Sequence, residues 1–275
     1  LMPDFRSEDG LKLYYSDEGE GLPVLALAGL TRNSSDFDYL DQALEGFRLI
    51  RLDSRGRGRS DWADPSTYTV LQESRDAMAL LDHLEIEKAA IIGTSRGGLI
   101  AMTIAATAKE RLLGVALNDV GPVIDPKGLK RIAGYIGQKP PQKSYAELAE
   151  LRAKMIDGFV NVPIARWRSE VMHSYRKVDG AVELRYDPRL RDGVLAALEQ
   201  PLPDLWPFFD ALADLPLALI RGENSELLTS ETAKEMQRRR PDMIFAEVPD
   251  RGHVPFLDED EALIALSGWL ELMQE

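Results

Sequence analysis

The chain has 275 residues, a formal net charge of −13 and no cysteine. An acidic protein of this kind repels nucleic-acid phosphates and anionic lipid surfaces, so we expect neither as a partner. The absence of cysteine excludes disulfides, thiolate nucleophiles and cysteine-based metal sites. Hydrophobic residues make up 44% of the chain and charged residues 29%, an ordinary composition for a globular protein with a large core.

Strand patterns alternate with helical patterns over most of the chain. In chain order, short apolar runs predict strands at 11–16, 23–28, 47–52, 88–92, 113–118, 216–221 and 243–248. Apolar residues at helical spacing predict helices at 68–84, 96–108, 229–239 and 258–272. Several strands are almost continuously apolar, as strands covered on both faces are. The alternation predicts an α/β fold with a mostly parallel sheet.

The alternation stops between about 121 and 205. Helical patterns occur there at 144–158, 163–177 and 190–199, but no convincing buried strand. Glycine and proline residues bracket the stretch on both sides. We interpret 121–205 as a helical lid inserted over the carboxyl edge of the sheet, with 1–120 and 206–275 forming the core.

Residues 93–97 read Gly-Thr-Ser-Arg-Gly and match the G-x-S-x-G pattern. The pattern alone is weak, but here it falls between a predicted buried strand and a predicted helix. A turn this tight leaves no room for side chains at 93 and 97, and it exposes Ser95 at the top of the sheet beside the helix N-terminus. Ser95 is therefore the predicted nucleophile. The alternative is a glycine-rich turn without chemistry.

With this turn, the chain resembles the α/β-hydrolase superfamily, and its lid-bearing esterase and haloperoxidase-like branch in particular. The resemblance extends from the strand at 11 to the helix ending near 272. Residues 53–60 (Asp-Ser-Arg-Gly-Arg-Gly-Arg-Ser) resemble the D-x-R-G-x-G-x-S loop of that branch, and we interpret them as a structural turn rather than a phosphate cradle. The resemblance implies a mostly parallel eight-stranded sheet with helices on both faces and a helical lid.

The chain has three histidines, and His253 is the predicted base. It lies in a loop between the last predicted strand and the last helix, where the resemblance places the general base. His83 lies at a helix end and is predicted to be structural. His173 lies in the insertion, where it is able to line a pocket but has no strand-end placement.

The carboxylate that orients the base is the least certain member of the predicted triad. The resemblance places it after the strand ending near 220, where Glu226 stands in place of the usual aspartate, so Glu226 is our choice. Glu223 lies nearer the strand end. Asp119 ends the strand that follows the nucleophile helix, and some members of the family take their acid there. Both remain open alternatives.

An oxyanion hole needs two backbone N–H donors. By resemblance these come from Arg96, after the nucleophile, and from Leu30, where Ala28 replaces the usual histidine. The Arg96 side chain either bridges surface acids or reaches the pocket. Tyr135, Met155, Phe159, Trp167 and Met172 of the lid, and Trp206, Phe208 and Phe209 beyond it, are predicted to pack the lid on the core, some of them lining a pocket. Arg166, Arg168 and Arg176 are predicted on a solvated face; one that faces inward is able to hold a substrate carboxylate.

These features favour a serine hydrolase of a small ester or related acyl substrate, closest to the carboxylic ester hydrolases (EC 3.1). One alternative keeps the triad for cofactor-free perhydrolase, haloperoxidase or C–C bond hydrolase chemistry. Another is a non-catalytic ligand-binding receptor on the same fold. We expect no metal or other cofactor. The polar N-terminal stretch and the lack of a long apolar run predict a cytoplasmic protein without a membrane partner; the sequence predicts no oligomeric state.

Overall fold

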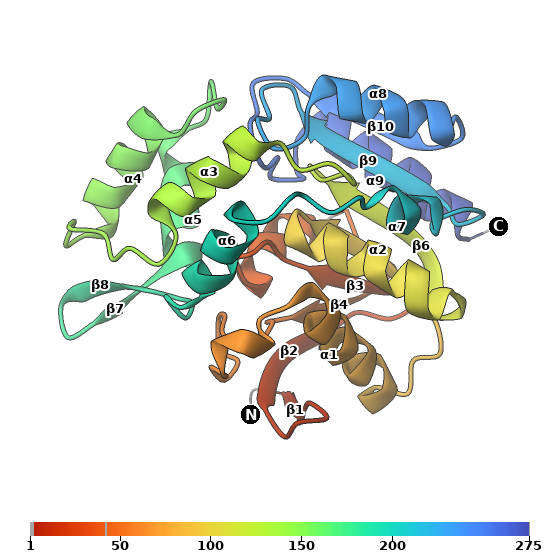
Figure 1. Ribbon diagram of the computed structural model, residues 1–275, viewed down its shortest axis with the longest axis horizontal. Helices are drawn as coiled ribbons and strands as arrows, with labels where there is room; N and C mark the ends of the chain where they lie inside the picture. The colour runs from red at the N-terminus through yellow and green to blue at the C-terminus, as the bar shows by residue number, and fades with distance from the viewer. Residues whose placement is uncertain (1–2, 42, 275) are drawn as a thin grey trace.

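An eight-stranded sheet forms the centre of the computed structural model, which describes residues 3–41 and 43–274 (Figure 1). The strand order is β1-β2-β4-β3-β5-β6-β9-β10. The strands are β1 (Asp4–Arg6), β2 (Lys12–Glu18), β3 (Pro23–Leu27), β4 (Arg48–Leu52), β5 (Ala89–Thr94), β6 (Leu112–Asn118), β9 (Leu217–Gly222) and β10 (Ile244–Val248). Pairing is antiparallel for β1 with β2 and β2 with β4, and parallel from β4 to β10. The predicted mostly parallel eight-stranded sheet is confirmed.

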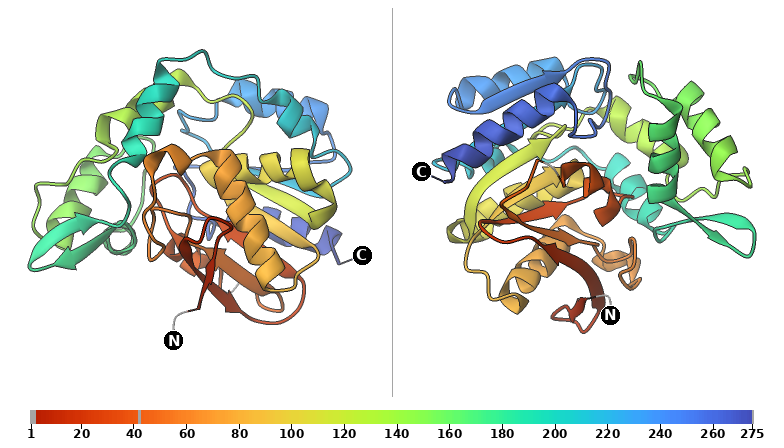
Figure 2. Two further views of the ribbon diagram at one scale, coloured as in Figure 1. Left: turned by 60° about the horizontal axis from the view of Figure 1, so that its bottom comes forward. Right: turned by 180° about the vertical axis from the view of Figure 1, so that it is seen from behind.

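Helices cover both faces of the sheet, because each central strand sends alternate apolar side chains to opposite sides. In β5, Ile91 packs into the cluster that holds α1 (Val70–His83), α2 (Arg96–Ala108), α7 (Trp206–Asp210) and α8 (Ser230–Arg239). Ala90 and Ile92 pack into the cluster on the other side, with η1 (Ser34–Leu40) and α9 (Asp260–Leu272). Figure 2 shows α9 in front when the molecule is seen from behind. Each fully buried Ile or Leu in these clusters contributes about 1.5–3 kcal/mol to stability.

The stretch between β6 and β9 contributes no strand to the large sheet among the described residues. It holds α3 (Pro126–Tyr135), α4 (Tyr145–Met155), α5 (Ile164–Ser174), the hairpin β7 (Tyr175–Val178) and β8 (Ala181–Leu184), and α6 (Leu190–Leu198). These elements lie together at one side of the sheet in Figure 1. The helix expected over 163–177 ends at Ser174, where the chain continues as β7. Neither α3 nor the β7–β8 hairpin was predicted. The division into a lid (121–205) and a core stays a prediction.

None of the helices in the described ranges combines the length and the apolar character needed to cross a membrane.

Candidate active site

Ser95 lies on the sharp turn between β5 and α2. Its φ of 51° is in the left-handed region, where a non-glycine residue is strained, as expected at a nucleophile elbow. Gly93 and Gly97 make the turn possible. A Cβ on Gly93 would stand 2.5 Å from the Gly97 carbonyl oxygen, and one on Gly97 would overlap the Leu27 carbonyl oxygen. The glycine positions of the motif are therefore explained by backbone crowding.

A hydrogen-bonded chain leads from Ser95 through His253 to Asp119. The Ser95 Oγ lies 2.9 Å from His253 Nε2, and His253 Nδ1 lies 2.6 Å from Asp119 Oδ2. Because a carboxylate only accepts hydrogen bonds, Nδ1 carries the proton, and Nε2 is left to accept from the Ser95 hydroxyl. Ser95 follows β5, Asp119 follows β6 and His253 follows β10. These strands are parallel members of one sheet, so their carboxyl ends lie at the same edge and bring the three residues together.

Asp119 is fully buried and held by further donors. Its Oδ1 accepts from the Gly222 N–H at 2.8 Å, and its Oδ2 also accepts from the Ser225 hydroxyl at 2.6 Å. Nearby, the Asn118 side-chain amide donates to Thr94 Oγ1 and to the Pro255 carbonyl, each at 3.2 Å. These hydrogen bonds connect the end of β6 to the nucleophile turn after β5 and to the histidine loop after β10. They fix the relative positions of the three residues.

The predicted acid, Glu226, is placed elsewhere by the structure. Its carboxylate pairs with Arg131 at 2.9 Å and its side chain is 46% exposed. Glu223 instead accepts from the Asp250 N–H at 3.2 Å. Both ring nitrogens of His253 are already occupied by Ser95 and Asp119, so the choice of Glu226 is corrected to the alternative Asp119. The loop after β9 contributes a hydroxyl that supports the acid, through Ser225, and not the acid itself.

The backbone N–H groups of Leu30 and Arg96 are the expected oxyanion donors. In the part of the chain that the structure describes, neither has a hydrogen-bond acceptor within the protein. Leu30 lines the same cavity as Ser95, and Arg96 N is the first nitrogen of α2. This arrangement leaves two donors near the nucleophile for a developing negative charge.

A buried glutamate, Glu73, is linked to both Arg96 and Leu30. Glu73 of α1 pairs with the Arg96 guanidinium (Nε to Oε1, 2.9 Å) and with Arg57 Nη1 at 3.0 Å. Arg57 Nε in turn donates to the Leu30 carbonyl at 2.8 Å. Burial alone would raise the pKa of Glu73, but the charges of Arg57 and Arg96 outweigh burial and lower that pKa. The Arg96 side chain therefore pairs with a buried acid, Glu73, and does not line the cavity.

A cavity of about 760 Å³ opens above Ser95, a size that suits a small-molecule ligand. Its walls come from the loop after β3, the histidine loop and the helices α3, α4 and α5. Of the predicted apolar residues, Tyr135, Met155, Phe159 and Trp167 line it. The others lie outside: Met172 is exposed, while Trp206, Phe208 and Phe209 belong to or pack against the core.

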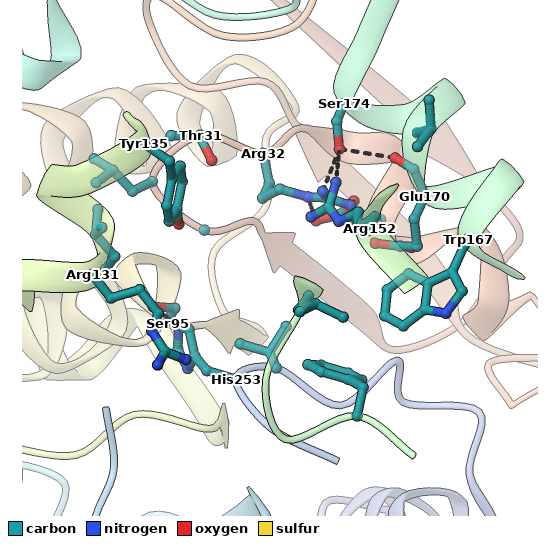
Figure 3. Close-up of a pocket in the computed structure, with 18 of the residues that line it drawn as sticks. Thr31, Arg32, Ser95, Arg131, Tyr135, Arg152, Trp167, Glu170, Ser174 and His253 are labelled. Atoms are coloured by element: carbon teal, nitrogen blue, oxygen red, sulfur yellow. Dashed lines mark hydrogen bonds and ion pairs between the residues drawn. The ribbon is translucent and has the colours of Figure 1, made fainter. Parts of the chain in front are cut away.

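A charged cluster joins α5 to the loop after β3 and to η1 at one wall of this cavity (Figure 3). Arg32, in the loop after β3, pairs at 2.7 Å with both Asp36 of η1 and Glu170 of α5. Asp36, Glu170 and His173 bring potential metal-ligand atoms within 4.8 Å of one another. The Arg32 guanidinium already occupies both carboxylates, so this cluster fits an ion-pair network better than a metal site.

The remaining predicted residues have structural surroundings. His83 lies beside the rings of Phe5 and Tyr15, at centroid distances of 5.7 and 5.9 Å. Arg166 pairs with Asp258 and lies 3.8 Å above the Tyr39 ring. In the loop 53–60, the Arg55 guanidinium is buried against Asp76 at 2.7 Å, so the interpretation of this loop as a structural turn agrees with the contacts.

Comparisons with known proteins agree with this fold. A model of the Alpha/beta hydrolase family matches residues 24–266. The 3-hydroxybutyrate-oligomer hydrolase of Cupriavidus necator is 36% identical over 262 residues, 91% of this chain and 89% of that protein. The 2-(acetamidomethylene)succinate hydrolase of Mesorhizobium japonicum is 26% identical over 246 residues, 88% of this chain and 85% of that protein.

A solved structure is also similar over nearly its whole length. The crystal structure of an alpha/beta hydrolase from Novosphingobium aromaticivorans superposes with a TM-score of 0.90 at 37% identity, covering 98% of this chain and 97% of that one. The family model covers the chain from β3 into α9, including the nucleophile turn and the histidine loop. The chain therefore belongs to the alpha/beta hydrolase family.

Proposed function

We propose that this hydrolase cleaves a short carboxylic ester through a Ser95–His253–Asp119 triad. The observation that carries the proposal is the chain of hydrogen bonds at 2.9 and 2.6 Å, which ends in a hydroxyl at the floor of a cavity. A hydroxyl is a weak nucleophile by itself, and a base within hydrogen-bond distance is what activates it. The strained φ of Ser95 further supports a functional rather than a merely structural turn.

The proposed reaction follows from this geometry. Ser95 Oγ attacks the ester carbonyl carbon while His253 Nε2 takes its proton, and Asp119 stabilises the imidazolium. The Leu30 and Arg96 N–H groups bind the oxyanion of the tetrahedral intermediate. The C–O bond to the alcohol breaks as His253 returns the proton to the leaving oxygen, which leaves an acyl-enzyme. Water, deprotonated by His253, then attacks this ester, and the free acid leaves with Ser95 regenerated.

The names of the relatives suggest the class of ester. The relative at 36% identity is named for oligomers of 3-hydroxybutyrate, which are joined by ester bonds between hydroxy-acid units. A cavity of about 760 Å³ has room for a molecule of two or three such units. We therefore propose short hydroxy-acid esters as substrates, with a small molecule as the only partner that the reaction requires.

The test is to compare wild type with Ser95→Ala. We expect wild type to hydrolyse p-nitrophenyl butyrate and a 3-hydroxybutyrate dimer, and Ser95→Ala to lose at least about 10⁴-fold in kcat because the nucleophile is gone. A fluorophosphonate probe should add its mass to wild type and not to the variant, as read by mass spectrometry of the intact protein. Equal turnover by both proteins overturns the proposal. A folded wild type that neither reacts with the probe nor turns over ester favours a ligand-binding role instead.

A further inference from the structure

The cavity is lined by four arginine and lysine side chains, and three of them have a carboxylate partner. Arg32 pairs with Asp36 and Glu170, Arg131 with Asp157 and Glu226, and Lys139 with Glu183 at 3.6 Å. The fourth is Arg152 of α4. Within residues 3–41 and 43–274, no carboxylate lies within ion-pair distance of it, and Ser174 Oγ, at 3.3 Å, accepts its one hydrogen bond to the protein. One lining cation is thus left without a counter-charge.

Arg152 is half-buried in the wall formed by the lid. Figure 3 shows its guanidinium beside that of Arg32, and dashed lines join both groups to the Ser174 hydroxyl. Because Ser174 Oγ donates its own proton to the Glu170 carbonyl at 2.8 Å, it offers only lone pairs to the two arginines. A guanidinium has five N–H donors, and those of Arg152 are largely unused.

Two acids that line the same cavity, Glu170 and Asp36, have other cations as ion-pair partners. Glu170 and Asp36 carry two negative charges, and they face Arg32 at 2.7 Å and His173 at 3.7 and 3.9 Å. Burial alone would lower the pKa of His173, but the carboxylates of Asp38 and Glu170 outweigh burial and raise that pKa to about 9. His173 is therefore protonated at neutral pH, so Arg32 and His173 both face these two acids, and Arg152 keeps N–H donors free for a ligand.

We propose that Arg152 binds a free carboxylate of the substrate, so that the enzyme prefers hydroxy-acid esters that end in a carboxylate to their neutral counterparts. A single planar guanidinium fits a carboxylate, whereas the nearby Glu170 disfavours a dianion such as a phosphate monoester. A local cation is also required, because the net charge of −13 repels anions from the molecule as a whole. The side chains of Tyr135, Leu148 and Leu151 line the same cavity and are suited to the alkyl part.

This inference rests on the proposed ester hydrolysis and is tested with a matched pair of substrates, the 3-hydroxybutyrate dimer as free acid and as methyl ester. In Arg152→Gln, we expect kcat/KM for the free acid to fall roughly 10- to 100-fold, because a charge-assisted hydrogen bond is lost. The methyl ester should change less than about 2-fold. Arg168→Gln is the control, because Arg168 is an exposed lid arginine outside the cavity and should change neither value. Equal losses on both substrates overturn the inference, as does a selective loss of the free acid in Arg131→Gln but not in Arg152→Gln.

Wild type supplies a second measurement that does not depend on the fold of a variant. It should prefer the free acid to the methyl ester by at least about 10-fold at low salt, and the preference should shrink as salt screens the charge. Equal rates on the two substrates, or a preference for the methyl ester, overturn the inference whatever the variants do. If wild type hydrolyses neither compound nor p-nitrophenyl butyrate, the proposed function itself fails, and this outcome is distinct from a loss of carboxylate preference.

Discussion

Asp119 has three donors around one small carboxylate: the Gly222 N–H, the Ser225 hydroxyl and the His253 imidazole. Replacing Asp119 with Asn keeps the size but removes the charge that stabilises a protonated His253. We expect Asp119→Asn to lower kcat on p-nitrophenyl butyrate by about 10³- to 10⁴-fold, as loss of the orienting acid does in other triads.

Glu226→Gln is the matched control for this change. The Glu226 side chain is 46% exposed, and its pair with Arg131 is of the kind that contributes about 1 kcal/mol at most. We expect kcat to stay within about 3-fold of wild type. If Glu226→Gln loses more activity than Asp119→Asn, the proposed acid is wrong.

Two residues of the proposed triad could be predicted from the sequence, and the acid could not. Ser95 and His253 were predicted because local patterns identify them: a strand, a glycine-bounded turn and a helix in one case, and a loop between strand and helix in the other. The acid depends on which strand end approaches His253 Nδ1, and that is a tertiary distance. Arg152 carried no signal in the sequence, since its lack of a counter-charge emerges only when the partners of Arg32, Arg131 and Lys139 are known.

At the scale of elements, Glu73 couples α1 to both residues of the proposed oxyanion hole. Its side chain is 1% exposed and forms ion pairs with both Arg57 and Arg96. Glu73→Gln removes the counter-charge of the buried Arg57 guanidinium and of the Arg96 guanidinium, which is 17% exposed. We expect the free energy of unfolding in urea to fall by about 3–5 kcal/mol, the usual cost of breaking a buried pair, and kcat to fall by about 10-fold as Leu30 and Arg96 lose their support.

Asp82 is the control position on the same helix. It pairs with Arg111, and its side chain is 67% exposed. Asp82→Asn should therefore change the unfolding free energy by less than about 1 kcal/mol and leave kcat unchanged. Similar losses in the two variants would contradict the role of Glu73 as a buried bridge.

Several of the elements that sequence missed, the hairpin β7–β8 and β1 among them, are short and partly exposed. The hairpin β7–β8 turns at Asp179 and Gly180, which have φ values of 49° and 78°, and a two-residue Asp-Gly turn is a recognised hairpin signal. The signal was obscured because a helical pattern runs directly into it and β7 has no buried side chain. The three residues of β1 are too few for a periodicity to be read. The long strands and helices were predicted because burial imposes their pattern over many residues.

At the scale of the whole molecule, the predicted fold class is confirmed: the almost continuous apolar runs belong to strands covered on both faces. How the insertion docks on the sheet did not follow from periodicity. It involves contacts between groups far apart in the chain, such as the ion pair of Arg32 with Glu170, 138 residues later. The cytoplasmic location and the absence of nucleic-acid and membrane partners stay predictions.

The charged cluster around Arg32 and Glu170 makes the stability of the molecule depend on pH, because it includes His173. The ring lies 3.5 Å from Asp38, 3.7 Å from Glu170 and 3.9 Å from Asp36, and its pKa of about 9 lies above the usual 6.5. A group whose pKa is raised by folding stabilises the folded state fully below its unfolded pKa, and this contribution is lost as the pH rises through the folded pKa. We therefore expect the stabilisation from His173 to be complete near pH 6 and absent above about pH 9.5.

His173→Gln isolates this contribution, because every other titrating group is shared with wild type. Urea unfolding from pH 6 to 10 should show wild type losing on the order of 2 kcal/mol relative to the variant between about pH 6.5 and 9.5. The His173 side chain is 14% exposed while Asp38 is 51% exposed, so solvent screens part of the attraction and the loss stays below that of a fully buried pair. A constant difference between the two proteins over this range would mean that His173 remains neutral, and that Asp36 and Glu170 have Arg32 and not His173 as their charged partner where α5 meets η1.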